Sequence, residues 1–239
     1  MKVYFFTGAG VSAESGISTF RDSNGLWENN KISEVCNINT WRKNKESVFK
    51  FYSERRMQLA TVQPNLIHMK ISELQKKYGE DNVVIITQNV DDLFERSGCK
   101  NVLHLHGNLT KIHCTNKKCN FEKDIGYEEY LDSICPECNQ NELKPSIVFF
   151  GENAPNYHFM KRYFHFIEPE DIFIIMGTLG NVVPIQLHTD FFDCTKILNN
   201  LEESDYIKSS SFDHVFLKSG TEAILDISEI IESKFNENK

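Results

Sequence analysis

The feature that most constrains the fold is a glycine loop directly after an apolar run near the N-terminus. Residues 3–6 (Val-Tyr-Phe-Phe) predict a strand buried on both faces, as in a parallel sheet. Gly8 and Gly10 follow and carry no Cβ, so the backbone can turn sharply and approach a ligand closely. N–H groups at the start of a following helix favour an anion such as a pyrophosphate.

The spacing Gly8-x-Gly10-x-x-Ala13 fits a relaxed dinucleotide-binding fingerprint. The acidic residue that usually follows about 20 positions later is missing, and a plain turn after a strand is the alternative interpretation. We expect a doubly wound parallel α/β sheet of the Rossmann-like type.

Composition and charge exclude several classes of protein. The 239 residues carry a net charge of −8, which argues against a dedicated nucleic-acid binder and suits attraction to basic protein segments. No run reaches the roughly 18 apolar residues of a membrane span, and no signal peptide is evident. Seven cysteines without a secretion signal indicate a reducing compartment. We therefore expect a cytoplasmic monomer without nucleic-acid or membrane partners.

Polar side chains follow further buried strands. The expected strand 82–87 leads into Gln88-Asn89-Val90-Asp91, and ligands of open α/β sheets bind at such carboxyl ends. The expected strand 102–107 carries two histidines, His104 and His106, whose side chains point to opposite faces, so only one can face the ligand. An imidazole titrates near ~6.5 and can act as a general base.

Four cysteines have the spacing of metal ligands. Cys114-x4-Cys119 is followed after 15 residues by Cys135-x2-Cys138, which predicts a zinc ribbon with one structural ion. Four thiolates leave no open position for water, so the metal takes no part in chemistry. A disulfide framework is the alternative.

The glycine loop and its continuation carry a family resemblance. Residues 8–21 read Gly-Ala-Gly-x-Ser-x-x-Ser-Gly-Ile-Ser-x-Phe-Arg, which closely resembles the NAD-binding loop of the sirtuins, the NAD-dependent protein lysine deacylases; Ser18 replaces the family's proline. The resemblance implies NAD as co-substrate and acylated lysines of proteins as partners. It implies cofactor contacts from Gly8, Ala9, Gly10, Ser12, Phe20, Arg21, Trp27, Gln88, Asn89, Asp91, Gly177, Thr178, Leu179, Asn200, Leu201 and Glu202.

The resemblance also assigns catalytic roles. His106, in the segment that matches the family's His-Gly-x-Leu, is the implied base that takes a proton from a ribose hydroxyl, and Asn89 and Asp91 hold the ribose and a nearby water. The implied products are nicotinamide, free lysine and O-acyl-ADP-ribose. Leu179 and Phe94 depart from the family pattern, which has serine and histidine at these positions.

A predicted helix over residues 44–60 indicates acyl specificity. Tyr52 and Arg55 lie three residues apart on one face, and Tyr-x-x-Arg resembles the class III sirtuins and the bacterial CobB group, where the pair recognises succinyl and malonyl groups. The alternative is a tyrosine that packs and an arginine that is solvated. Cys36 stands where these enzymes carry a small residue of the acyl pocket.

An expected strand over residues 146–152 resembles the family segment that pairs with the substrate main chain. This implies substrate contacts from Val148, Phe150 and Gly151, with an ordinary core strand as the alternative.

We expect residues 1–33, 61–107 and 145–239 to form the NAD-binding domain, 34–60 a helical flap and 108–144 the zinc module. Three other functions remain open: a mono-ADP-ribosyltransferase or NAD hydrolase, a non-catalytic NAD-sensing module, and a zinc-ribbon interaction protein.

Overall fold

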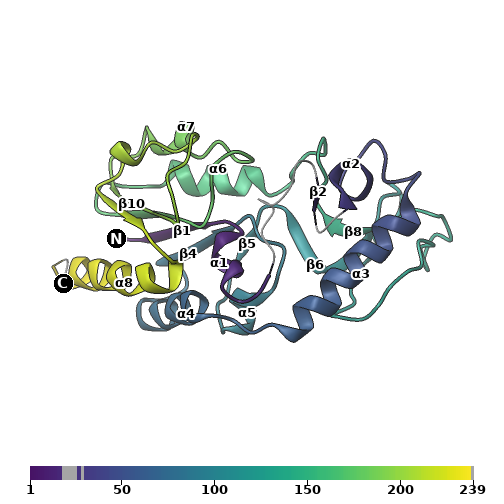
Figure 1. The fold of residues 1–239 in the computed structure, drawn as a ribbon, viewed down its shortest axis with the longest axis horizontal. Helices are drawn as coiled ribbons and strands as arrows, with labels where there is room; N and C mark the ends of the chain where they lie inside the picture. Colours follow the sequence, from purple (N-terminus) through teal and green to yellow (C-terminus); the bar gives the residue numbers. More distant parts are fainter. Residues whose placement is uncertain (18–25, 28–29, 238–239) are drawn as a thin grey trace.

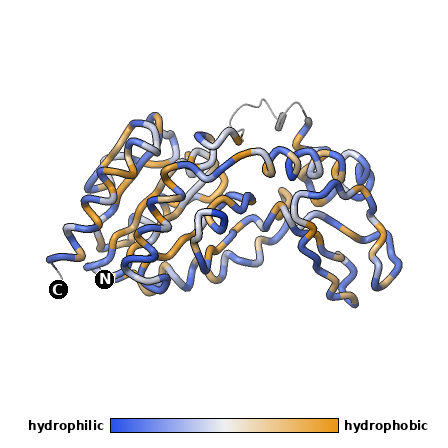
Figure 2. Tube along the Cα trace, turned by 90° about the horizontal axis from the view of Figure 1, so that it is seen from below, coloured by the Kyte–Doolittle hydropathy of each residue, from blue (hydrophilic) through white to orange (hydrophobic). Residues whose placement is uncertain are grey.

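The computed structural model describes residues 1–17, 26–27 and 30–237, and the side chains of residues 26, 27 and 30 are not described. The chain forms a larger lobe that contains both termini and a smaller lobe at the opposite end (Figure 1). The same division is visible from below (Figure 2). No helix in the described part of the chain has the length and apolar character needed to cross a membrane.

The larger lobe is built on one six-stranded parallel sheet with the order β11-β10-β9-β1-β4-β5. Its strands are β1 (Val3–Thr7), β4 (Val83–Thr87), β5 (Leu103–His104), β9 (Ile172–Met176), β10 (Thr195–Asn200) and β11 (His214–Leu217). Strands β1, β4 and β9 are buried along their whole length because apolar side chains cover both faces. The strand order reverses beside β1, and such a switch point is where ligands of these sheets bind.

Helices cover both faces of this sheet, as a doubly wound fold requires (Figure 1). One apolar core joins the sheet to α4 (Leu66–Tyr78) and α8 (Gly220–Glu237). The other core joins the opposite face to α6 (Tyr157–His165) and the segment around α7 (Gln186–Thr189). The expectation of a doubly wound parallel α/β sheet is thus confirmed.

The start of α4 shows how local sequence sets a boundary. Asn65 is the N-cap residue: its side-chain oxygen accepts from the Ile67 amide at 3.0 Å, and its own amide donates to Nδ1 of His68 at 3.3 Å. His68 is fully buried, and burial lowers its pKa to about 4. His68 is therefore a structural histidine at this helix start.

The smaller lobe combines helices with an antiparallel sheet of order β7-β6-β8. It contains β2 (Leu26–Trp27), β3 (Asn30–Lys31), α2 (Ile32–Val35), α3 (Lys45–Thr61), β6 (Gly107–Cys114), β7 (Glu122–Asp124) and β8 (Leu143–Ile147). Its core places α3 against residues of β6 and β8. The remaining short elements are α1 (Gly10–Ala13), α5 (Leu93–Arg96) and the 3-10 turn η1 (Ser209–Ser211).

Two expected strands are shorter than the sequence predicts. The strand expected over 102–107 is regular only at Leu103–His104, and Gly107, with φ of +90°, turns the chain into β6. The strand expected over 146–152 ends at Ile147, and Gly151 has φ of +79°. A positive φ interrupts a strand. The small sheet formed by β6 and β8 also extends beyond the zinc module expected over residues 108–144, because it includes Gly107 and the residues up to Ile147. The division into domains stays a prediction.

Candidate functional site

Two glycine loops meet at the carboxyl ends of β1 and β9. The Gly10 amide donates to the Gly177 carbonyl at 2.9 Å. A Cβ added at Gly8 would lie 2.6 Å from the Thr178 Cβ, and one added at Gly10 would lie 2.7 Å from the Gly177 Cα. Gly177 also has φ of +63°. The absence of side chains at these glycines is therefore what allows the loops to touch at the switch point of the sheet.

A buried hydrogen-bond chain joins the first loop to the end of β4. The Asn89 amide group donates from Nδ2 to Ser12 Oγ at 2.9 Å, and Ser12 Oγ donates to Asp91 Oδ2 at 2.9 Å. The Leu93 amide donates to the other carboxylate oxygen at 3.2 Å. Burial raises the pKa of Asp91, and the bonds from Ser12 and Leu93 oppose that rise. These hydrogen bonds fix the orientation of the Ser12, Asn89 and Asp91 side chains.

Gln88 and Thr178 link the neighbouring strand ends. Gln88 Nε2 donates to Thr178 Oγ1 at 3.0 Å, and Asn200 Nδ2 donates to the Thr178 carbonyl at 2.9 Å. Leu179 accepts a hydrogen bond from Ser204 through its carbonyl at 2.6 Å. The structure thus brings the expected residues of β4, β9 and β10 together at one edge of the sheet.

His106 lies at the same edge and is held through both ring nitrogens. Nδ1 is 3.1 Å from the Gln88 carbonyl, and Nε2 is 2.9 Å from the Tyr157 hydroxyl. Because a carbonyl only accepts, Nδ1 carries the proton in the neutral ring and Nε2 accepts from Tyr157. Burial lowers the pKa of His106, and the Gln88 bond partly counteracts this, so the neutral form that can take a proton is favoured.

Tyr157, the first residue of α6, was not predicted from the sequence. It contacts His106 across 51 residues, and no spacing or motif marks it. The preceding residue anchors the helix start, because Asn156 Nδ2 donates to the His104 carbonyl at 2.7 Å.

His104 has a different environment from His106. Its Nδ1 lies 2.8 Å from the Asn89 carbonyl and its Nε2 lies 2.8 Å from Glu95 Oε1. Burial lowers the pKa of His104, but the Glu95 carboxylate outweighs this effect and the pKa is raised overall. The Nδ1 atoms of the two imidazoles thus bond the consecutive carbonyls of Gln88 and Asn89. Their Nε2 atoms have different partners, a phenol for His106 and a carboxylate for His104.

Some predicted cofactor residues are not described or are not part of the hydrogen bonds given above. Phe20 and Arg21 lie outside the described residues, and Trp27 belongs to β2 without a described side chain. Leu201 and Glu202 follow the end of β10 and are exposed. Ala9 precedes α1, and its carbonyl accepts from the Ser12 and Ala13 amides.

The two residues of the predicted acyl-binding pair on α3 differ in burial. The Tyr52 ring is fully buried and stacks on Phe149 with centroids 5.8 Å apart, while its hydroxyl interacts with the Cys36 thiol. Arg55 is half-buried with its guanidinium 5.1 Å above the Phe51 ring. Tyr52 therefore packs beside Cys36, and the role of the pair in acyl binding stays a prediction.

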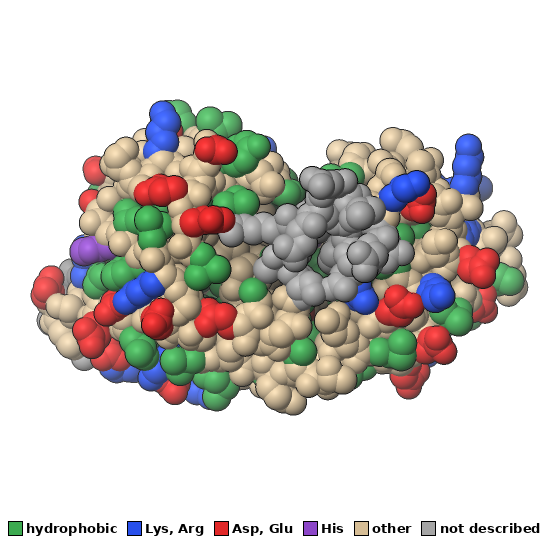
Figure 3. Space-filling model, viewed as in Figure 1, with side chains coloured by type: hydrophobic (Ala, Val, Ile, Leu, Met, Phe, Trp, Pro, Cys, Tyr) green, Lys and Arg blue, Asp and Glu red, His purple; other side chains and the backbone are tan. Residues whose placement is uncertain are grey.

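The segment predicted to bind substrate lies between His106 and α2. The Val148 amide donates to the His106 carbonyl at 2.9 Å. Phe150 donates to the Cys36 carbonyl at 3.0 Å and accepts from the Ile38 amide at 3.1 Å. The segment that contains Gly151 is therefore bonded to the His106 backbone on one side and to the flap on the other. On the face drawn in Figure 3, a notch separates the two lobes.

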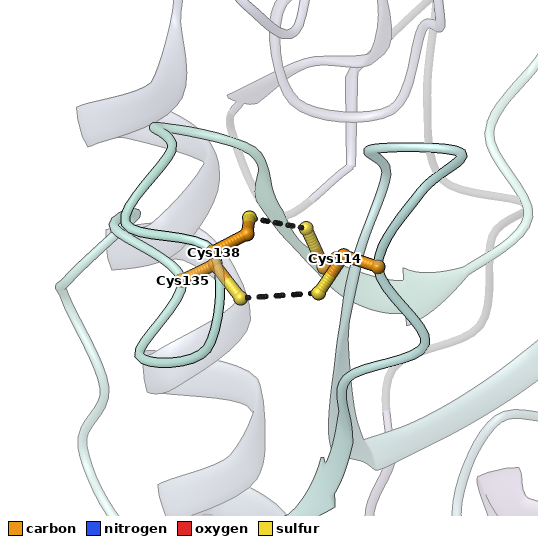
Figure 4. Close-up of side chains that lie close together, drawn as sticks. Cys114, Cys135 and Cys138 are labelled. Atoms are coloured by element: carbon orange, nitrogen blue, oxygen red, sulfur yellow. Dashed lines mark hydrogen bonds between the residues drawn. The ribbon is translucent and has the colours of Figure 1, made fainter.

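The smaller lobe holds the predicted metal centre (Figure 4). One ligand atom from each of Cys114, Cys119, Cys135 and Cys138 lies within 4.8 Å of the others. The Sγ atoms of Cys114 and Cys138 are 3.7 Å apart, as are those of Cys119 and Cys135. A tetrahedral zinc with bonds of about 2.3 Å requires sulfur separations of about 3.8 Å, so the four thiolates fit one zinc ion.

The other potential ligands lie outside this cluster. His113 bonds Ser146 Oγ through Nδ1 at 3.0 Å. Cys36, Cys99 and Cys194 are buried as free thiols and are not part of the four-sulfur group. The spacing of the cysteine pairs therefore selected the correct four ligand candidates.

Comparisons with known proteins agree with this architecture. The profile of the Sir2 family matches residues 8–184. An NAD-dependent protein deacylase of Helicobacter hepaticus is 43% identical over 98% of both chains, and one of Campylobacter jejuni is 42% identical over 97% of this chain and 96% of its own.

Solved structures show the same fold. A Sir2 homologue in complex with NAD superposes with a TM-score of 0.81 at 32% identity, over 97% of this chain and 90% of the other. A mutant Sir2 homologue in complex with ADP-ribose gives 0.84 at 31% identity, over 98% and 93%. Because the profile covers well over half of the chain, from the first glycine loop through the metal centre to the residues after β9, the chain belongs to the Sir2 family.

Proposed function

We propose that this protein is an NAD-dependent protein lysine deacylase. The observation that carries the proposal is the meeting of Ser12, Asn89, Asp91 and His106 at the switch point of the sheet. Membership in the Sir2 family and relatives named as NAD-dependent protein deacylases over nearly the whole chain support it.

The residues around the two glycine loops suit NAD chemically. Amide groups from Gln88 and Asn89, the hydroxyls of Ser12 and Thr178 and the Asp91 carboxylate are the donors and acceptors that ribose hydroxyls and phosphates need. Gly8 and Gly10 keep the backbone of the first loop free of side chains. Bound NAD would supply the ADP-ribose that accepts the acyl group, with nicotinamide as the leaving group.

His106 is the group that would move a proton. Its Nδ1 carries a proton that is donated to the Gln88 carbonyl, so Nε2 is the atom that would take a proton from a ribose hydroxyl. Asn89 and Asp91 are held by Ser12 and orient the ribose and a water beside it. Much of the rate gain would come from holding the reactants together, on the order of 7–11 kcal/mol in favourable cases.

The acylated lysine would enter beside residues 148–151, which bond the His106 carbonyl and the residues directly after α2. We further propose a preference for acidic acyl groups, because Arg55 and Tyr52 share one face of α3 and the small side chain of Cys36 adjoins Tyr52. The cytoplasm as location and the monomeric state remain proposals that rest on the sequence.

A panel of acylated peptides tests the activity. Wild type with NAD and an acyl-lysine peptide is expected to release nicotinamide and O-acyl-ADP-ribose together, measured by mass spectrometry. His106→Ala should abolish turnover while NAD still binds, and His158→Ala, at an exposed position of α6, is the matched control. Nicotinamide release without peptide deacylation would identify an NAD hydrolase instead. Persistent deacylation by His106→Ala would exclude the proposed base.

The acyl preference needs a separate comparison. We expect kcat/KM to be higher for succinyl than for acetyl peptides, and Arg55→Met should reduce this ratio by about tenfold because a charged hydrogen bond is lost. Lys50→Met removes an exposed cation from the same helix and should leave the ratio unchanged. A wild type that strongly prefers acetyl peptides would refute the preference without affecting the deacylase proposal.

A further inference from the structure

A buried ion pair lies next to the segment predicted to bind substrate. The Lys144 side chain on β8 is 0% exposed, and its Nζ is 2.9 Å from Glu152 Oε2. Fully buried lysines are rare and are normally paired. Neither residue belongs to the metal centre or to the proton chemistry at His106.

The pair is bonded to the backbone on both sides of Val148. Lys144 Nζ also donates to the Ile147 carbonyl, and Glu152 Oε2 accepts from the Phe149 amide at 2.9 Å. The ammonium therefore holds the residue before Val148, and the carboxylate holds the residue after it.

The same pair supports the aromatic ring that contacts Tyr52. Lys144 Nζ lies 3.9 Å from the centroid of Phe149, and Tyr52 stacks on Phe149 with an interplanar angle of 15°. A cation over an aromatic ring is attracted to it, so loss of the ammonium would free the ring that Tyr52 packs on.

The environment favours a positioning role over a contribution to net stability. Burial lowers the pKa of Lys144, and the Glu152 carboxylate counteracts this by favouring the charged form. Buried ion pairs add little net stability compared with apolar residues of similar volume, although the loss of one partner is costly. Apolar residues of similar volume could not form the directed hydrogen bonds that Lys144 and Glu152 make to Ile147 and Phe149.

We propose that Lys144 and Glu152 are positioning residues for the acylated substrate. They hold residues 147–151 in the conformation with which the main chain of the substrate peptide pairs. The proposal rests on the deacylase function, in which Val148, Phe150 and Gly151 bind that peptide. It assigns to the pair a role in peptide affinity that is separate from NAD binding.

Four variants separate positioning from stability. Glu152→Leu leaves the buried Lys144 ammonium without its partner and Lys144→Met leaves the partly exposed Glu152 carboxylate without its partner, so both should lower the melting temperature, the first more strongly. The double variant Lys144→Met/Glu152→Leu removes both charges and should recover most of the loss. Glu152→Gln keeps an oxygen that can accept from the Phe149 amide and should act as a partial rescue.

The decisive readout is the double variant once its melting temperature has recovered. Its Kd and KM for an acyl-lysine peptide should stay raised by about tenfold, because the two backbone positions have lost their charged hydrogen bonds. Its Kd for ADP-ribose should equal that of wild type. Glu152→Gln should give a smaller rise in peptide Kd than Glu152→Leu.

Two results would overturn the proposal. Recovery of peptide affinity together with the melting temperature would make the pair merely structural, and so would equal losses of peptide and ADP-ribose affinity. If the double variant does not fold, equal peptide Kd values for Glu152→Leu and wild type at matched folded fractions would have the same meaning. A wild type that neither binds nor deacylates acyl-lysine peptides refutes the deacylase function itself.

Discussion

The Tyr157 hydroxyl lies 2.9 Å from Nε2 of His106, the nitrogen through which the proposed base would act. The phenol donates to this nitrogen when the imidazole is neutral and can accept from it when the ring is protonated. Burial raises the pKa of Tyr157, so the hydroxyl stays protonated near neutral pH. Tyr157 can therefore serve both protonation states of His106 without carrying a charge.

Replacement of Tyr157 by phenylalanine should weaken the base. A hydrogen bond to a charged group is stronger than one to a neutral group, so the protonated ring loses more than the neutral ring does. We expect the pKa of His106 in Tyr157→Phe to fall by about 0.5 to 1 pH units and kcat to fall several-fold. NMR titration of the imidazole and steady-state kinetics test this.

Tyr163→Phe is the matched control, because Tyr163 belongs to the same helix and its ring packs against Tyr4. It should leave the His106 titration unchanged. An unchanged or higher pKa in Tyr157→Phe would contradict the role of the phenol.

The pH dependence of the reaction should show the lowered pKa of His106. The base acts in its neutral form, and burial disfavours the imidazolium. The neutral form therefore persists to lower pH than in a solvated histidine, and activity is lost only when the pH falls through the lowered pKa. The acid limb of kcat/KM for NAD should have its midpoint below about 6.5, the ordinary pKa of a solvated imidazole. A midpoint at or above that value would show that another group controls the limb.

Removal of the metal should unfold the smaller lobe. The four cysteines close β6, the segment after it and the loop before β8 into one cluster, so metal binding contributes directly to folding there. We expect one zinc per chain by elemental analysis. A strong chelator or Cys135→Ser should cause loss of zinc and a lower melting temperature. Cys99→Ala alters a thiol outside the cluster and should retain the metal. Full zinc content in Cys135→Ser would contradict the assignment.

Gly107 should tolerate no side chain, because two separate effects combine at this position. Its φ is +90°, and an added Cβ would lie 1.9 Å from the Ser146 carbonyl oxygen in the neighbouring strand. Gly126 also has a positive φ, of +57°, but an added Cβ meets nothing within 4 Å. Gly126→Ala should therefore cost about 1 kcal/mol of unfolding free energy from backbone strain alone. Gly107→Ala should cost clearly more, and equal losses in urea unfolding would contradict the steric argument.

Features that depend on short spacings could be predicted. The apolar runs of β1 and β4 are found where the sequence places them, because complete burial requires an uninterrupted apolar stretch. The cysteine pairs converge to 3.7 Å contacts, as their spacing indicated. Gln88, Asn89 and Asp91 follow β4 directly, so the end of that strand alone places them at the edge of the sheet.

Features that depend on distant partners could not be predicted. Tyr157 meets His106 across 51 residues, and Lys144 and Glu152 bond the backbone at Ile147 and Phe149. The helical spacing of Tyr52 gave no sign that its ring stacks on Phe149. Periodicity shows which residues share a face of a helix, but it does not show what covers that face.

The sequence by itself thus determined the family, the doubly wound sheet, the ligand candidates of the metal centre and the polar residues at the strand ends, because each follows from residue types a few positions apart. Only the tertiary structure decided which nitrogen of His106 bonds the Gln88 carbonyl, which side chain faces the other nitrogen, and how Lys144 and Glu152 hold the backbone on both sides of Val148. Hydrogen bonds between distant residues, and the burial of their side chains, depend on the tertiary fold of the whole chain. The spacing of nearby residues does not specify these contacts.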